Sequence, residues 1–169
     1  MTDARGPSWR RLPPTFRALG LWITLVQLVG YTTGLFFIHH TTGMTPPGVA
    51  TQYRGTDSTV VSDAAMKFPK SYPEMLNITH THLLSMAAIF VFSGMALVLC
   101  ERPSERWRRF LVVEPFVALL VSFSAMWLMR YVDERFSWLL TLSSGVMALT
   151  FYVQSFFVLR ELLPGRTTA

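Results

Sequence analysis

The stretch ALGLWITLVQLVGYTTGLFFI, residues 18–38, decides the fold class of this chain. It contains no charged residue, and it is followed directly by His39 and His40. A helix needs about 20 apolar residues, at 1.5 Å rise each, to cross the roughly 30 Å of hydrocarbon in a bilayer. The stretch therefore predicts one membrane-spanning helix.

Three further stretches have the same character, at residues 78–100, 110–129 and 139–159. Only the third span is interrupted by a charge, at Glu114. The strands of a membrane barrel would alternate in polarity, and these stretches do not alternate. The sequence predicts an all-α membrane protein, a four-transmembrane-helix bundle. Residues 1–17 are expected to form a cytoplasmic tail, and residues 18–169 a single transmembrane domain.

The net charge of +5 is distributed unevenly between the two sets of connecting segments. One set holds ten arginines: Arg5, Arg10, Arg11, Arg17, Arg102, Arg106, Arg108, Arg109, Arg160 and Arg166. The other holds Arg54, Lys67, Lys70, Arg130 and Arg135. The positive-inside rule then places both termini inside. We expect a multi-pass protein of a bacterial inner membrane, in contact with anionic lipid and without a nucleic-acid partner.

The connection between the first two spans, residues 39–77, is expected to be a long outer, periplasmic loop. Within it, residues 49–54 favour a short surface turn that ends at Gly55. Ser71 and Glu74 have the spacing of a capping box, which predicts that the second long helix begins near Tyr72. Long connections without regular structure are often functional. This loop is the place where we expect a periplasmic redox partner to bind.

Small residues predict where the helices pack. Pairs with small-xxx-small spacing occur at Gly30 and Gly34 and at Ser144 and Ala148. Such pairs let membrane helices approach closely. Gln27 and Gln154 are expected to form hydrogen bonds across helices.

All four histidines lie at the same predicted face of the bilayer: His39 and His40 end the first span, and His80 and His82 begin the second. At about 100° per residue, His80 and His82 point about 200° apart and cannot share a site. The face of His82 continues through Met86, which favours His82 as the ligand that points inward. Ionisable groups within membrane segments are candidates for function.

Our leading hypothesis is a subunit of a bacterial respiratory or other electron-transfer complex that binds or contacts one b-type haem near the outer face. Haem iron takes axial histidine pairs, and facing helices of a bundle can supply them. We expect His82 and His40 as the axial ligands, with His39 and His80 as substitutes. Histidines at a single level allow one haem only.

Copper is the first alternative. Thioether and imidazole ligands suit Cu(I), and the outer face is rich in methionine. His82 and Met86, four residues apart on a helix, could chelate one ion from the same side. The expected ligands in this case are His82, Met86, His40 and Met44.

The second alternative is a non-catalytic accessory subunit, without a cofactor, that binds other membrane subunits. Glu114 is a candidate proton relay, although a carboxylate there more often reaches Arg109 or the lipid headgroups. The single cysteine, Cys100, excludes thiol chemistry by a cysteine pair. No HExxH, GxSxG or phosphate-loop motif occurs, so we do not expect the chain to be an enzyme on its own.

Overall fold

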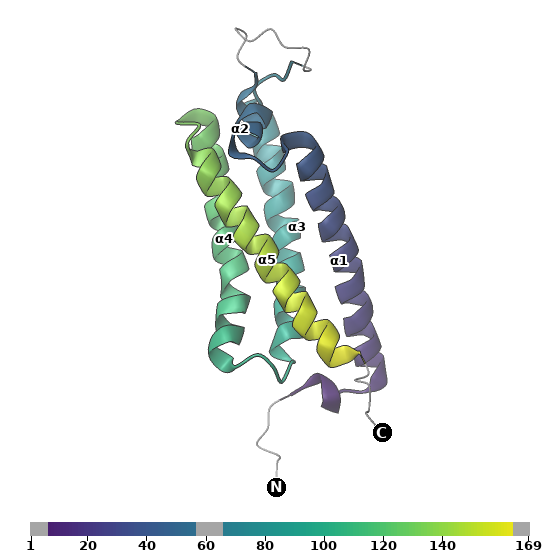
Figure 1. Ribbon diagram of the computed structural model, residues 1–169. Helices are drawn as coiled ribbons and strands as arrows, with labels where there is room; N and C mark the ends of the chain where they lie inside the picture. Colours follow the sequence, from purple (N-terminus) through teal and green to yellow (C-terminus); the bar gives the residue numbers. More distant parts are fainter. Residues whose placement is uncertain (1–6, 57–65, 164–169) are drawn as a thin grey trace.

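The structure is a computed structural model that describes residues 7–56 and 66–163. Figure 1 shows four long helices in one bundle, with a short helical element near each end. The elements are η1 (Trp9–Arg11), α1 (Pro14–Thr42), α2 (Pro46–Arg54), α3 (Tyr72–Val98), α4 (Glu105–Tyr131) and α5 (Phe136–Leu162). The helices α1, α3, α4 and α5 are each long and apolar enough to cross a membrane. The predicted all-helical bundle with four spanning helices is confirmed.

The bundle has two chemically different ends. At one end, η1, the α3–α4 connection and the last turn of α5 meet, and we call it the basic end (Figure 1). At the opposite end, α1 stops and α3 starts, and we call it the histidine end. Arg5 and Arg166, counted above toward the charge of one side, lie outside the described residues, as do positions 57–65 of the long connection. Which end faces the cytoplasm stays a prediction.

The segment before α1 is packed onto the basic end. Trp9 is only 5% exposed, and its indole Nε1 donates a hydrogen bond of 2.8 Å to the carbonyl oxygen of Ala96. Its backbone N–H donates to the carbonyl oxygen of Leu99 at 3.0 Å. Gly20 makes room for the indole, because a Cβ at that position would lie 2.4 Å from Trp9 Cη2. The ring thus joins α1 to the end of α3.

The helices α4 and α5 have the most extensive contact of any helix pair in the described part of the chain. The Oγ of Ser122 lies 2.8 Å from the Oγ of Ser143 and 3.3 Å from the Oγ of Ser144. Further along, the amide of the fully buried Gln154 donates to the carbonyl oxygen of Leu111. Small hydroxyl residues allow membrane helices to approach closely, and polar side chains bond across them. The expected contact at Ser144 and the expected cross-helix bond of Gln154 are both confirmed.

The helix α2 covers the histidine end. Val49 and Ala50 are buried against three methionines, Met75, Met126 and Met129. The sequence predicted only a surface turn over residues 49–54, because this segment is largely polar. Its few apolar residues did not indicate a helix face that packs against methionines. The helix ends at Arg54 and is followed by Gly55, where φ is +87° and where the sequence predicted the end of the turn.

The start of α3 agrees with the sequence. The Ser71 side chain accepts a hydrogen bond from the backbone N–H of Glu74, and the Glu74 carboxylate accepts one from the backbone N–H of Ser71. This reciprocal pair is a capping box, and it fixes the first helical residue at Tyr72. The predicted start of the second long helix is confirmed.

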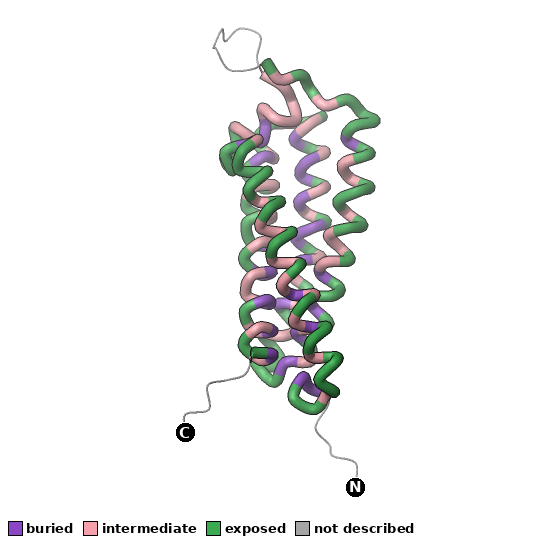
Figure 2. The backbone as a smooth tube through the Cα atoms, turned by 90° about the vertical axis from the view of Figure 1, so that its right-hand side faces the viewer, coloured by how far each residue is buried: buried purple, intermediate pink, exposed green. Residues whose placement is uncertain are grey.

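The helix α1 is the least enclosed of the four. Its buried residues are Gly20, Thr24 and Thr42. In Figure 2 the side of the bundle that holds α1 faces the viewer, and most of this helix is coloured as exposed or intermediate. A Cβ at Gly30 or at Gly34 would meet no atom within 4 Å. The predicted packing seam along these two glycines is therefore wrong for this bundle.

Contacts of Tyr31 and Thr32 with α5 explain the open glycine face of α1. The ring of Tyr31 stacks on the ring of Phe151 of α5, with centroids 4.3 Å apart. The hydroxyl of Thr32 lies 2.8 Å from the hydroxyl of Tyr152, also on α5. These contacts turn the face of Tyr31 and Thr32 toward α5, so the glycines face elsewhere.

Candidate functional site at the histidine end

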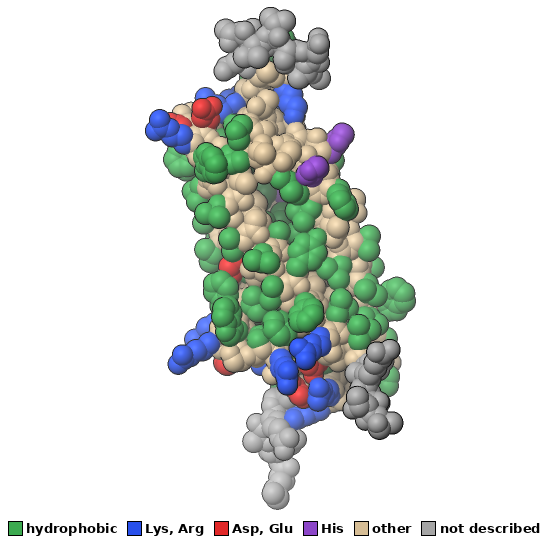
Figure 3. Space-filling model, in the orientation of Figure 1, with side chains coloured by type: hydrophobic (Ala, Val, Ile, Leu, Met, Phe, Trp, Pro, Cys, Tyr) green, Lys and Arg blue, Asp and Glu red, His purple; other side chains and the backbone are tan. Residues whose placement is uncertain are grey.

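All four histidine side chains are exposed. His39 and His40 lie in the last turn of α1, and His80 and His82 lie in the third turn of α3. Figure 3 shows histidine side chains at the upper end of α1. Among the described residues, no group of three or more histidine, cysteine, aspartate or glutamate side chains is arranged to hold a metal ion.

One hydrogen bond sets the register between α1 and α3. The amide Nε2 of Gln27 lies 3.4 Å from the carbonyl oxygen of Ile89, which confirms the expected cross-helix bond of Gln27. The two helices run in opposite directions (Figure 1). Seven residues further toward the histidine end, Gly34 on α1 and His82 on α3 therefore lie at the same level, about 10 Å from this bond.

Ideal helix geometry also predicts that Gly34 and His82 lie on the flanks of α1 and α3 that face each other. Seven residues correspond to about 700°, so Gly34 lies within about 20° of the direction of Gln27 on α1. By the same geometry, His82 lies within about 20° of the direction of Ile89 on α3. The histidine is thus on the flank of α3 that faces α1.

The space between these two residues is open. No atom lies within 4 Å of where a Cβ of Gly34 would be, and His82 is exposed. In Figure 3 the surface is hollowed beside the upper half of α1, below the histidines. We call this opening, bordered by Gly30 and Gly34 of α1 and by His82 of α3, the α1–α3 crevice.

One ring nitrogen of His82 is in a hydrogen bond, and the other has no partner among the described residues. Its Nδ1 lies 3.0 Å from the carbonyl oxygen of Ile78. A carbonyl oxygen can only accept, so Nδ1 carries the hydrogen in this contact, and the lone pair is on Nε2. Histidines that bind metals usually donate their other ring N–H to a carbonyl or carboxylate in this way. His82 therefore presents a nitrogen suited to metal ligation.

The other three histidines do not point into the crevice. His80 lies about 180° from the direction of Ile89 around α3. His40 lies about 140° from the direction of Gln27 around α1, and roughly 9 Å further out than Gly34. His39 is about 120° from the same direction. Within one bundle, the structure thus does not bring His40 and His82 onto one face.

The methionines of the copper alternative are also apart. Met86 packs against the buried cluster around Phe90. Met44 follows the end of α1 and has a positive φ of 54°. Helix rise places the two about 18 Å apart along the bundle. The set of His82, Met86, His40 and Met44 is therefore not gathered at one point.

The carboxylate of Glu114 lies inside α4, with one oxygen buried. Its Oε2 has no hydrogen-bond partner among the described residues. The contact with Arg109 that the sequence favoured is not found in that part of the chain. Neither a proton donor nor a proton acceptor is placed against Glu114 by these contacts, so its role as a relay stays a prediction.

The four apolar helices define the class of this protein, a helical multi-pass membrane protein in a lipid bilayer. The chain belongs to the Aq_1264_TM family, a transmembrane helical domain, whose model matches residues 43–169. The matched segment begins directly after α1 and contains α2 to α5. No curated protein and no solved structure matches the chain.

Proposed function

We propose that this protein is a membrane-embedded subunit of an electron-transfer complex, and that it binds or contacts one b-type haem near the histidine end through His82. The observation that carries the proposal is the exposure and the hydrogen bonding of the His82 side chain. It is exposed on the α1-facing flank of α3, its Nδ1 bonds to the carbonyl oxygen of Ile78, and its Nε2 has no partner among the described residues.

The opposite wall of the α1–α3 crevice suits a flat ligand. Gly30 and Gly34 carry no side chain, and glycine lets a ligand approach the backbone closely. Ile38, one turn further out, lies within about 20° of the direction of Gln27 and adds an apolar wall. A macrocycle held by His82 would therefore lie against bare helix surface on one side.

A second axial ligand would come from another subunit, because His39, His40 and His80 are turned away. The surface of α3 supports such a neighbour. Its outer half exposes a strip of small polar side chains at Asn77, Thr81 and Ser85, which share one face at four-residue spacing. Small polar residues in membrane helices favour contact with another helix over contact with lipid.

The test is an absorption spectrum of the protein extracted from its native membrane in a mild detergent, with its partners retained. We expect a Soret band that co-purifies with the chain. Gly34→Leu, which fills the crevice, should lower the haem content. Gly145→Leu, at a glycine of α5 that also has no atom within 4 Å of its Cβ position, is the matched control and should not.

Two results would overturn the proposal. The first is the absence of a Soret band both in the complex and in the isolated chain; saturable copper binding in that case would favour the copper alternative. The second is an equal haem content in the Gly34→Leu and Gly145→Leu proteins, which would place the haem elsewhere.

A further inference from the structure

A groove runs along the surface between α3 and α4, toward the basic end, away from the histidines. Its volume is about 410 Å³, within the range of about 300–1,000 Å³ that is typical of small-molecule sites. Its walls are apolar side chains and one glycine. They are Phe90, Val91, Gly94, Met95, Val98, Leu99, Val112 and Phe116.

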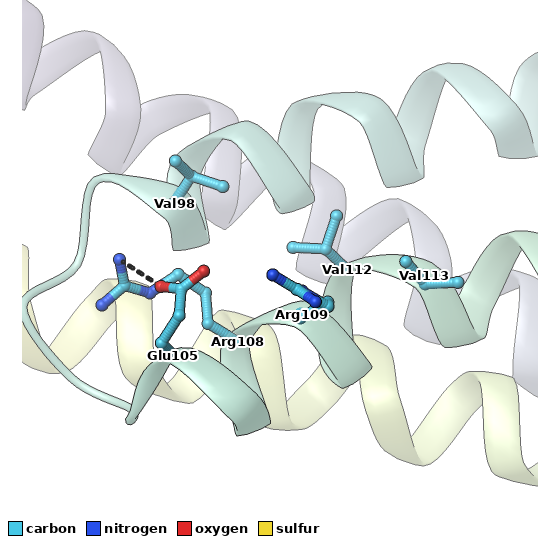
Figure 4. Close-up of a pocket in the computed structure, with 6 residues that line it drawn as sticks. All are labelled: Val98, Glu105, Arg108, Arg109, Val112 and Val113. Carbon is cyan, nitrogen blue, oxygen red and sulfur yellow. Dashed lines mark ion pairs between the residues drawn. The ribbon is translucent and has the colours of Figure 1, made fainter.

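The groove continues into a second, charged hollow of about 220 Å³ at the end of the bundle. The two hollows share Val98 and Val112 as walls. Figure 4 shows the charged hollow, with the guanidinium group of Arg109 on the same side of α4 as Val112 and across from Val98. The two hollows thus form one continuous surface along the first turns of α4, apolar at one end and positively charged at the other.

The charges at this mouth are only partly compensated. Glu105 pairs with Arg108, with 3.5 Å between Oε2 and Nη1 (Figure 4). The Nη2 of Arg108 also donates a hydrogen bond of 3.2 Å to the carbonyl oxygen of Pro103, and its Nε is buried without a partner in the described part of the chain. Arg109 has no ion pair or hydrogen bond to any described residue. The mouth therefore has a net positive charge, and Arg109 is the cation there that has no acceptor among the described residues.

We propose that this groove binds one anionic phospholipid, with an acyl chain between α3 and α4 and the phosphate at Arg109. Phosphate oxygens form strong charge-assisted hydrogen bonds with guanidinium groups. Basic pockets between membrane helices are typical sites for anionic headgroups. The distance from Arg109 to Phe116, seven residues further along α4, is about 10 Å, which fits within the roughly 15 Å depth of one leaflet.

A protein helix fits the same groove less well. A helix seated there would bury the guanidinium of Arg109 without a counter-charge, and an unpaired buried charge is strongly unfavourable. A lipid phosphate supplies that charge at the level of the headgroups. The site is separate from the α1–α3 crevice, so this proposal does not depend on the haem.

Native mass spectrometry of the full chain in a neutral detergent tests the proposal, with titration of phosphatidylglycerol or phosphatidylcholine. We expect one phosphatidylglycerol to bind more tightly than phosphatidylcholine. Arg109→Gln should weaken phosphatidylglycerol binding by about fivefold, as expected for the loss of one cation that contacts an anionic lipid. Arg106→Gln is the matched control, since Arg106 is exposed but does not line the groove.

A second variant tests the acyl part of the site. Val98 is 47% exposed and lines both hollows, so Val98→Trp should block the groove without removing a buried side chain, and lipid binding should be lost. Equal affinity for the two lipids, or equal effects of Arg109→Gln and Arg106→Gln, would overturn the proposal. Competition by inorganic phosphate as strong as by the lipid would also overturn it, because the site would then bind the anion alone.

Discussion

The substitution Gly20→Ala should loosen the basic end, although it adds only a methyl group to a helix. The new Cβ would lie 2.4 Å from Trp9 Cη2 and 2.8 Å from Trp9 Cζ3, so the indole must move. Overpacking of this kind costs about 1–3 kcal/mol. The upper bound is the cost of losing the ring altogether, about 3–5 kcal/mol for Trp→Ala.

The matched control is Gly30→Ala on the same helix, where a Cβ meets no atom within 4 Å. Both variants gain the same helix propensity, up to about 1 kcal/mol, so their difference isolates the contact with Trp9. We expect Gly20→Ala to lower the free energy of unfolding by about 1–3 kcal/mol relative to Gly30→Ala. The assay is loss of helical circular dichroism as SDS is titrated into mixed micelles.

Cys100 provides a local measurement of the same change. Its thiol is 2% exposed and belongs to the same buried cluster as Trp9. Displacement of the indole should therefore speed maleimide labelling of Cys100 in Gly20→Ala and not in Gly30→Ala. Equal unfolding midpoints together with equal labelling rates would refute the assigned position of Trp9.

Three further substitutions test other contacts by the same SDS titration. Met75→Ala should lower the free energy of unfolding by about 2–5 kcal/mol, because Met75 is fully buried under α2. Leu76→Ala, at a residue that is 47% exposed, should change this free energy little. Similar losses for both variants would contradict the packing of α2. Ser71→Ala removes half of the capping box and should cost about 0.5–2 kcal/mol, and no loss would mean that the cap is not formed. Gln154→Leu should cost about 0.6–2 kcal/mol through the lost bond to Leu111, and a gain in stability would contradict that bond.

The sequence predicted the parts of the fold that depend on local chemistry. Four apolar stretches were sufficient for the long helices, and the capping box at Ser71 was sufficient for the start of α3. The expected loop bounds of 39 and 77 were too wide, because α1 continues to Thr42 and α3 begins at Tyr72. Gln27 and Gln154 were recognised because an amide in a membrane segment needs a partner. Each of these predictions depends on a property of one segment alone.

The parts that the sequence did not predict depend on how segments meet. The packing of Trp9 against Gly20 was missed, since a tryptophan in a basic tail resembles an ordinary interfacial anchor. Gly30 and Gly34 were assigned to a seam because of their spacing, but Tyr31 decides which face of α1 meets α5. The position of His82 opposite Gly34 requires the register between two helices, which no pattern within either helix contains.

The measurement that tests the central claim most directly is the haem content per chain of His82→Ala and His80→Ala, isolated from native membranes beside the unmodified protein. The two histidines lie on the same helix, two residues apart, and only His82 faces the α1–α3 crevice. The account predicts that His82→Ala loses the haem or its low-spin spectrum, while His80→Ala keeps both. Full haem content with an unchanged spectrum in His82→Ala would contradict it.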